Sequence, residues 1–99
     1  KSYLSSSYSM LAIISANEGK FSEAGQKFNK ASKLAISKPF KNRLLFQSLN
    51  AYLKSNDLNK SEEILNLLEN DEDINKNHKD EYERLLHYFK IIKKRNSNN

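Results

Sequence analysis

The chain has 99 residues, enough for one small domain, and its 37% of hydrophobic residues is too high for a chain that is disordered throughout. Cysteine is absent, which excludes a disulfide framework, a thiolate metal site and a cysteine nucleophile. The 17 Lys and Arg outnumber the 12 Asp and Glu to give a net charge of +5, a balance that keeps acidic partners among the candidates.

Helices are favoured from the start of the chain, because two glycines, one proline and no valine leave few of the residues typical of β-hairpins. Residues 3–17 have apolar side chains at helical spacing on two sides, so this helix is expected to touch neighbours on both and to be central. Gly19 then suits a left-handed helix end, and Ser22 is expected to cap a second helix that runs to residue 36. The apolar side chains of the first helix are Leu4, Tyr8, Met10, Leu11, Ala12, Ile13, Ile14 and Ala16.

The second half of the chain has the same succession of helices and turns. Pro39 is expected to separate the second helix from a third over residues 41–54. A fourth helix covers 58–69, with Asn59 and Glu62 at the spacing of a capping box. Residues 70–77 are acidic and Asn-rich, which predicts a turn or a frayed helix start, and Asp80 and Glu83 are a second capping pair at the start of the last helix.

The expected fold is therefore all-α, a single domain over residues 1–95. Its parts are a hairpin at 3–36, a hairpin at 41–69 and a capping helix at 78–94, with 96–99 as a disordered tail. In the second helix, small Ala24 and Ala31 allow close helix approach while Phe21 and Phe28 fill the grooves, so this apolar stripe is expected to be core. The last helix is expected to bury Leu85 and Phe89 against the third and fourth helices.

The two hairpins also align with each other. Residues 19–24 match residues 56–61, and Phe28 then matches Leu65, a period of about 37 residues that is typical of helical-hairpin arrays. The first hairpin resembles the tetratricopeptide repeat family, whose pattern its residues fill at Tyr8, Leu11, Ala12, Gly19, Phe21, Ala24, Phe28 and Ala31. The resemblance implies a right-handed array of two antiparallel hairpins and a capping helix that binds a peptide or a partner helix.

A second resemblance competes with the first. Residues 19–35 are similar to the turn and second helix of microtubule-interacting-and-transport domains, which are three-helix bundles that receive short helical peptides of membrane-remodelling machinery. That alternative uses residues 3–17, 22–36 and 41–54 as the whole bundle and leaves the chain from Leu58 unexplained. Both resemblances imply a peptide-binding module.

The favoured binding surface is an inner groove between the first and third helices, whose small and polar side chains can hydrogen-bond a peptide. Its predicted residues are Ser5, Ser9, Ala12, Gln47, Ser48 and Ala51.

A basic surface for nucleic acid or another acidic surface is the alternative, with Lys20, Lys27, Lys30 and Lys33 along the second helix. Arginine, the residue that contacts phosphate and guanine in bidentate fashion, is scarce here. A lysine-rich helix face is also what plain solvation produces.

No motif points to catalysis. Gly19 and Gly25 alone cannot form a phosphate-binding loop, and Glu83 with His87 would need a third metal ligand from elsewhere. The sequence therefore predicts no catalytic residue, cofactor or metal, and a non-catalytic interaction scaffold. It is expected to be intracellular, in the cytoplasm, because it lacks cysteine and a visible signal segment. It is also expected to be a fragment of a larger protein.

Overall fold

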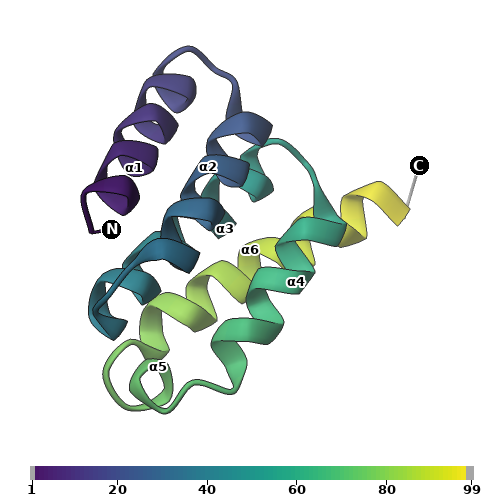
Figure 1. Ribbon diagram of the computed structural model, residues 1–99. Helices are drawn as coiled ribbons and strands as arrows, with labels where there is room; N and C mark the ends of the chain where they lie inside the picture. Colours follow the sequence, from purple (N-terminus) through teal and green to yellow (C-terminus); the bar gives the residue numbers. More distant parts are fainter. Residues whose placement is uncertain (1, 98–99) are drawn as a thin grey trace.

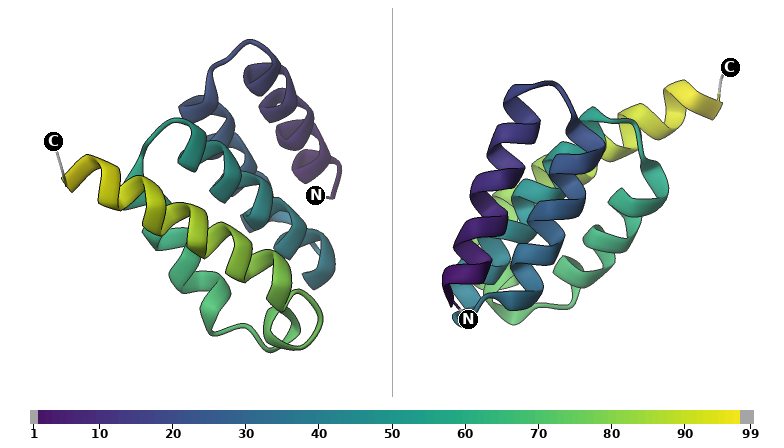
Figure 2. Two further views of the ribbon diagram at one scale, coloured as in Figure 1. Left: turned by 180° about the vertical axis from the view of Figure 1, so that it is seen from behind. Right: turned by 45° about the horizontal axis from the view of Figure 1, so that its top comes forward.

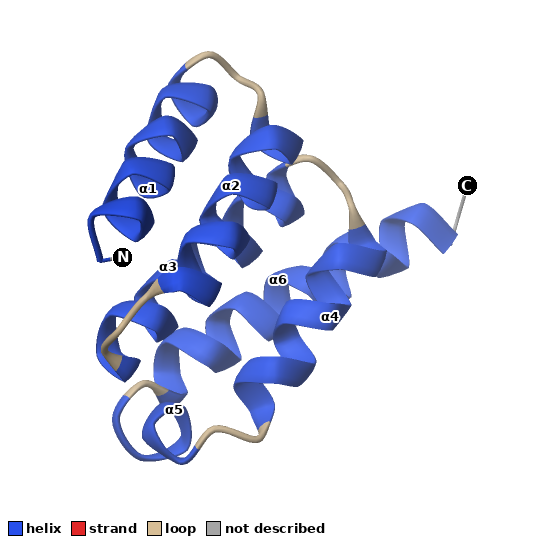
Figure 3. Ribbon diagram, in the orientation of Figure 1, coloured by secondary structure: helices blue, strands red, loops and turns tan. Residues whose placement is uncertain are grey.

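The computed structural model describes residues 2–97, and these residues form helices joined by short turns, with no strand in this range (Figures 1 and 3). The predicted all-α fold is confirmed. The helices are α1 (Ser2–Asn17), α2 (Phe21–Leu34), α3 (Lys38–Lys54), α4 (Leu58–Glu69), α5 (Glu72–Asn77) and α6 (Lys79–Ser97).

The helices stack in chain order as a repeat-like array. α2 packs against α1 on one side and against α3 on the other, and α4 pairs with α3. α6 crosses α3 and α4, as Figure 2 shows from behind, while α1 lies at the edge of the stack. This arrangement confirms that the last helix packs on the third and fourth.

The turns of the two hairpins have the same backbone form. Gly19 has φ 80° and Asn56 has φ 64°, so each hairpin turns through a left-handed residue directly after a helix. The amide of Lys20 donates to the carbonyl of Ser15 at 2.8 Å, and the amide of Asp57 donates to that of Tyr52 at 3.0 Å. Both bonds join residues five apart and close the helix end, so the aligned turns at 19 and 56 are structurally equivalent.

Three predicted helix caps are wrong by one or two residues. Lys20, not Ser22, lies at the N-cap of α2, where no side chain makes a capping hydrogen bond. Asp57, not Asn59, caps α4 by accepting from the amide of Lys60 at 3.1 Å. Asp80 lies inside the first turn of α6. Asp57 and Asn59 are both good capping residues, which makes the choice between them hard to read from a sequence.

Pro39 starts a helix instead of separating two. α2 ends at Leu34, and Ser37 caps α3 by accepting from the amide of Phe40 at 3.3 Å. Pro39 then lies in the first turn of α3, where its missing amide hydrogen costs nothing. α3 therefore begins at Lys38, three residues before the predicted start at 41.

The region expected to be a turn contains a short extra helix, α5, capped by Asp71, whose carboxylate accepts from the amide of Ile74 at 3.1 Å. Ile74 is fully buried, which explains why this segment folds onto the domain. At the other end α6 continues to Ser97. Residues 96 and 97 of the predicted disordered tail are therefore helical, and 98–99 lie outside the described residues.

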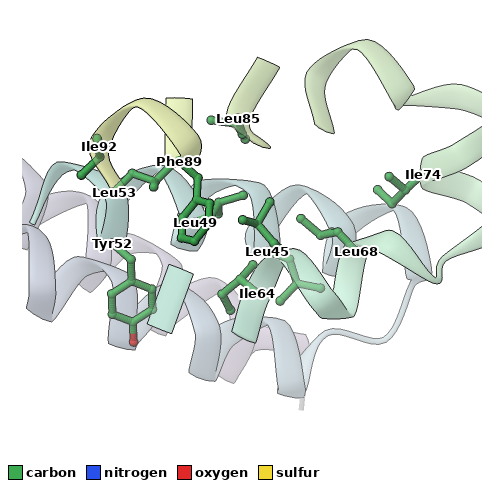
Figure 4. Packing of buried hydrophobic residues seen from close by; sticks show 11 residues of the cluster. Leu45, Leu49, Tyr52, Leu53, Ile64, Leu68, Ile74, Leu85, Phe89 and Ile92 are labelled. Carbon is green, nitrogen blue, oxygen red and sulfur yellow. The ribbon is translucent and has the colours of Figure 1, made fainter. Parts of the chain in front are cut away.

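The apolar interior consists of two clusters of different character. The larger cluster joins α3, α4, α5 and α6 and contains big side chains, several of which Figure 4 shows (Leu45, Leu49, Tyr52, Leu53, Ile64, Leu65, Leu68, Ile74, Leu85, Phe89 and Ile92). The predicted burial of Leu85 and Phe89 is confirmed. The smaller cluster joins α1, α2 and α3 through mostly small side chains (Ala12, Ala24, Phe28, Ala31, Leu44 and Ala51). Phe28 is buried as predicted, whereas Phe21 is half-buried.

The expectation for α1 is wrong. This helix is not central, and only small residues of it, Ser5, Ala12 and Ser15, are fully buried against the stack. Its large apolar side chains, among them Leu4, Leu11 and Ile14, remain exposed. Serines are spread around this helix and none of its residues is charged, so it shows no single inward apolar stripe and its sequence cannot tell which side meets the core.

Candidate functional site

One face of α3 stays accessible between the two clusters and carries polar and aromatic side chains at helical spacing. We call it the α3 face, and its residues are Arg43, Phe46, Gln47, Asn50 and Lys54. All five are half-buried or exposed, whereas the opposite side of the same helix supplies buried Leu45, Leu49 and Leu53 to the core. α3 is thus the central helix of the stack, with one face in the interior and one open.

A groove of about 350 Å³, the α3–α6 groove, opens along this face. Its floor includes the half-buried ring of Phe46, which meets the imidazole of His78 edge-on with 6.2 Å between ring centroids. The groove is lined by Pro39, Asn42, Arg43, Phe46, Gln47, Asn50, His78, Glu81 and Arg84. The lining combines the rings of Phe46 and His78 with amides, two arginines and one carboxylate, that of Glu81, a composition that suits a polar chain.

Two arginines from different helices line this groove. Arg43 extends from α3 and forms no ion pair with any described residue. Arg84 extends from α6 and its Nη2 lies 3.2 Å from Oε2 of Glu81, with both side chains about half exposed. An exposed pair of this kind is weak, and it leaves other N–H donors of Arg84 available. The groove therefore offers planar, charged donors to a carboxylate.

A smaller hollow of about 150 Å³, the α1–α3 hollow, lies on the other side of the α3 face. Gln47 and Asn50 line both spaces, so the groove and the hollow meet across α3. The Lys54 ammonium lies 5.4 Å from the centroid of the Phe21 ring at the end of this hollow. Together the two spaces form an extended track along α3.

A polar junction fixes one end of the groove. Asn42, buried on α3, donates from Nδ2 to the carboxylates of Asp71 at 3.4 Å and Asp73 at 3.3 Å. The Lys38 ammonium lies 3.2 Å from Asp71. These contacts tie the start of α3 to α5 and hold the segment that carries His78.

The pKa values of both carboxyl groups are lowered. Burial on its own would raise the pKa of Asp71, but the amide of Ile74 and the ammonium of Lys38 stabilise the charged form and outweigh it. For Asp73 the hydrogen bond from Asn77 is the largest cause, and Asn42 adds to it. Both groups are therefore charged when the junction is formed.

The structure scatters the six residues predicted for the inner groove. Ser5 and Ser48 are fully buried, and their hydroxyls donate to the carbonyls of Ala31 at 2.8 Å and Gly25 at 2.7 Å. Ala12 and Ala51 are also buried. Ser9 and Gln47 are half-buried, and of the six only Gln47 and Ala51 line the α1–α3 hollow. The Ser hydroxyls thus join helices rather than face a ligand.

The four predicted surface lysines are mostly engaged within the chain. Lys20 lies 3.5 Å from Glu18, and Lys27 donates to the Ser15 hydroxyl at 2.9 Å. The Lys30 ammonium lies over the Tyr8 ring at 4.9 Å from its centroid. Lys33 is exposed. Of the four, Lys27 and Lys30 lie at the seam between α1 and α2, while Lys20 pairs within the turn that joins these helices.

Four residues of the groove were not predicted from the sequence: Arg43, Phe46, Asn50 and Arg84. The signal for the first three is the i, i+3, i+7 spacing on a helix whose other side is strongly apolar. Arg84 comes from a helix far along the chain and meets the groove only because α6 crosses α3. Sequence spacing cannot show that meeting.

No helix among residues 2–97 has both the length and the apolar character needed to cross a bilayer. In the same range, no three His, Asp or Glu side chains converge in a way that would hold a metal ion. No protein-family model, curated protein or solved structure matches the chain. The functional argument therefore starts from the α3–α6 groove.

Proposed function

We propose that this chain is a non-catalytic interaction module whose α3–α6 groove binds an acidic segment of a partner protein. The observation that carries the proposal is the convergence of Arg43 and Arg84, from separate helices, on a groove floored by Phe46. A guanidinium binds a carboxylate through two parallel hydrogen bonds, which gives both affinity and geometric selectivity. The amides of Gln47 and Asn50 supply the donors and acceptors that a peptide backbone needs.

The arrangement of helices supports the resemblance to tetratricopeptide repeats as our preferred interpretation. α1 and α3 both pack on α2 and face each other across the α1–α3 hollow, an open stack in which an accessible face remains on each successive helix. A microtubule-interacting-and-transport bundle, the alternative, would close its three helices around one core. The equivalent turns at Gly19 and Asn56 also favour a repeated hairpin. The absence of cysteine suits a cytoplasmic location for this module.

Peptide display with matched variants tests the proposal. Selection of a random heptapeptide library on the whole chain is expected to enrich peptides rich in Asp and Glu. Their affinity, measured by fluorescence anisotropy, is expected to fall more than about tenfold in the Arg43→Glu/Arg84→Glu variant.

The control variant carries Lys33→Glu and Lys60→Glu, which change net charge equally at exposed positions outside the groove. Its affinity should stay near that of the original chain. Equal loss in both variants would mean that binding follows overall charge, and enrichment of basic or purely apolar peptides would contradict the proposal.

A further inference from the structure

The surface of α1 differs in charge from that of every other long helix of this chain. It carries no charged residue, although 29% of the chain is charged. Large apolar side chains cover the side that points away from α2: Tyr3 is 71% exposed, Met10 65% and Ile14 51%. We call this side the outer face of α1, and its residues are Tyr3, Leu4, Ser7, Met10, Leu11 and Ile14.

α1 packs on its own stack mainly through small side chains. Ser5 and Ala12 are completely buried on the inner side, and the Ser5 hydroxyl donates to the carbonyl of Ala31 at 2.8 Å. Ser15 accepts from Lys27 on the same seam. Monomeric proteins rarely expose contiguous apolar patches larger than a few hundred square ångströms, so a face of this kind marks an interaction surface.

The order of residues on the outer face is self-complementary. Tyr3, Ser7, Met10 and Ile14 follow the alternating spacing of four and three residues that forms the seam of paired helices. In two antiparallel copies related by a twofold axis between residues 8 and 9, Tyr3 lies opposite the partner's Ile14. Ser7 then lies opposite the partner's Met10, so that a small side chain meets a large one. Leu4 and Leu11 share one flank of the seam, where they meet the same flank of the other copy.

From this we infer that the outer face of α1 is the interface of a homodimer, in which two copies pair their α1 helices in antiparallel orientation. A face without charge can meet its own copy with no like-charge repulsion, whereas it has no charge with which to select an unlike partner. Antiparallel pairing also places each helix N-terminus beside the C-terminus of the other helix. A stable interface takes about 800 Å² from each partner, and the five large side chains of this face form its apolar centre.

The salt dependence of this dimer is opposite to that of peptide binding in the α3–α6 groove. Lys27 and Lys30 are held beside α1 by Ser15 and Tyr8, so pairing brings these lysines of both copies toward the interface margin. Salt screens their repulsion and strengthens the dimer, while it weakens the attraction between arginine and an acidic peptide. The effect of salt can therefore distinguish dimer formation from peptide binding in one protein sample.

Sedimentation equilibrium of the whole chain tests the dimer. A concentration-dependent dimer is expected, and Met10→Lys should raise its dissociation constant by more than about tenfold because it places a charge at the centre of the interface. Leu67→Lys is the matched control, since Leu67 is 58% exposed on α4, away from α1. It should leave the dissociation constant unchanged. A chain that stays monomeric at its highest soluble concentration overturns the inference, as does equal weakening by both variants.

Thiol cross-linking tests the antiparallel register, and the chain has no cysteine of its own to interfere. Tyr3→Cys and Ile14→Cys proteins are each expected to resist oxidative cross-linking alone, because like positions lie about 16 Å apart along the paired helices. An equal mixture of the two is expected to form a covalent dimer. Cross-linking of Tyr3→Cys to itself, or no cross-link in the mixture, contradicts antiparallel pairing. Circular dichroism confirms that each variant remains helical.

Discussion

Gly25 of α2 lies directly against the ring of Tyr52 in α3. A methyl group added at this glycine would lie 2.7 to 2.9 Å from three carbons of the ring, closer than atoms can approach without displacement. The carbonyl of Gly25 also accepts the buried hydroxyl of Ser48 at 2.7 Å. Glycine is therefore needed here for close packing of two helices, although it is a poor helix former.

Gly25→Ala is accordingly expected to destabilise the domain. Alanine favours the helix by about 1 kcal/mol, but overpacking of this kind costs about 1 to 3 kcal/mol and would also stretch the Ser48 hydrogen bond. Urea unfolding should show a net loss of up to about 2 kcal/mol. Gln26→Ala, at the exposed neighbouring position, serves as the control and should have little effect. A Gly25→Ala domain more stable than the original would show that helix propensity outweighs the contact with Tyr52.

Asp71 makes the stability depend on pH in a defined direction. Its pKa is lowered in the folded chain, so the unfolded chain binds a proton more readily. The stabilisation is complete above the unfolded pKa of about 3.9, and it is lost as the pH falls through the lower folded pKa. The domain is thus expected to lose stability as the pH drops below about 4.

Asp71→Asn removes the charge of Asp71 but keeps its capping role, because asparagine caps a helix as well as aspartate does. Thermal melts at a series of pH values should show a variant that is less stable at pH 7 and flatter in its response below about pH 4. The contribution of Asp73 should remain. Glu72→Gln changes the net charge equally at an exposed neighbour and should keep the original pH response. An unchanged response in Asp71→Asn would mean that the charge of Asp71 contributes nothing to the stability.

At the scale of elements, α6 covers the large cluster of α3 and α4. Leu85, Phe89 and Ile92 point into this cluster from one side of the helix, and the opposite side carries charge. Without α6 the apolar surfaces of Leu49 and Leu53 would face water. The helix is therefore expected to act as the cap that ends the array.

Phe89→Ala measures how strongly α6 is attached. Truncation of a buried aromatic ring costs about 3 to 5 kcal/mol, which is a large part of the stability of a small domain. Differential scanning calorimetry should show a markedly lower melting temperature, whereas His87→Ala, at an exposed position on the same helix, should melt like the original chain.

Deletion of residues 80–99 should abolish cooperative unfolding. A truncated chain that is soluble, does not aggregate and is equally stable would refute the capping role.

Some helices and their buried sides could be predicted from the sequence better than others. The inward sides of α3, α4 and α6 were predictable because charged residues mark the outer side of each helix, so that Leu45, Ile64 and Phe89 stand out as core. α1 has no charged residues to mark an outer side, and it was wrongly predicted to be central. α5 was missed because six residues are too few for periodicity to appear, and its helix depends on burial of Ile74.

At the scale of the whole molecule, the two halves of the stack are held together in different ways. The half formed by α3 to α6 is held by large side chains, while α1 and α2 are joined through alanines and buried serine hydroxyls such as that of Ser5. The proposed surfaces follow this division: the α3–α6 groove is built on the half with large side chains, and the outer face of α1 belongs to the half whose helices meet through small side chains. Of the groove residues only Gln47 was predicted, although helical spacing on α3 also marks Arg43, Phe46 and Asn50. The other side of the groove could not be predicted, because it depends on how α6 crosses α3.

An amide NMR titration of the whole chain with an acidic peptide from the display selection tests most directly whether the α3–α6 groove is the binding surface. The largest shifts are expected at Arg43, Phe46, Asn50 and Arg84, with little change along α4, and they should weaken as salt is added. The Arg43→Glu/Arg84→Glu variant should show no such pattern. Shifts confined to α1 and α2, or spread evenly over all the lysines, would contradict binding in the groove.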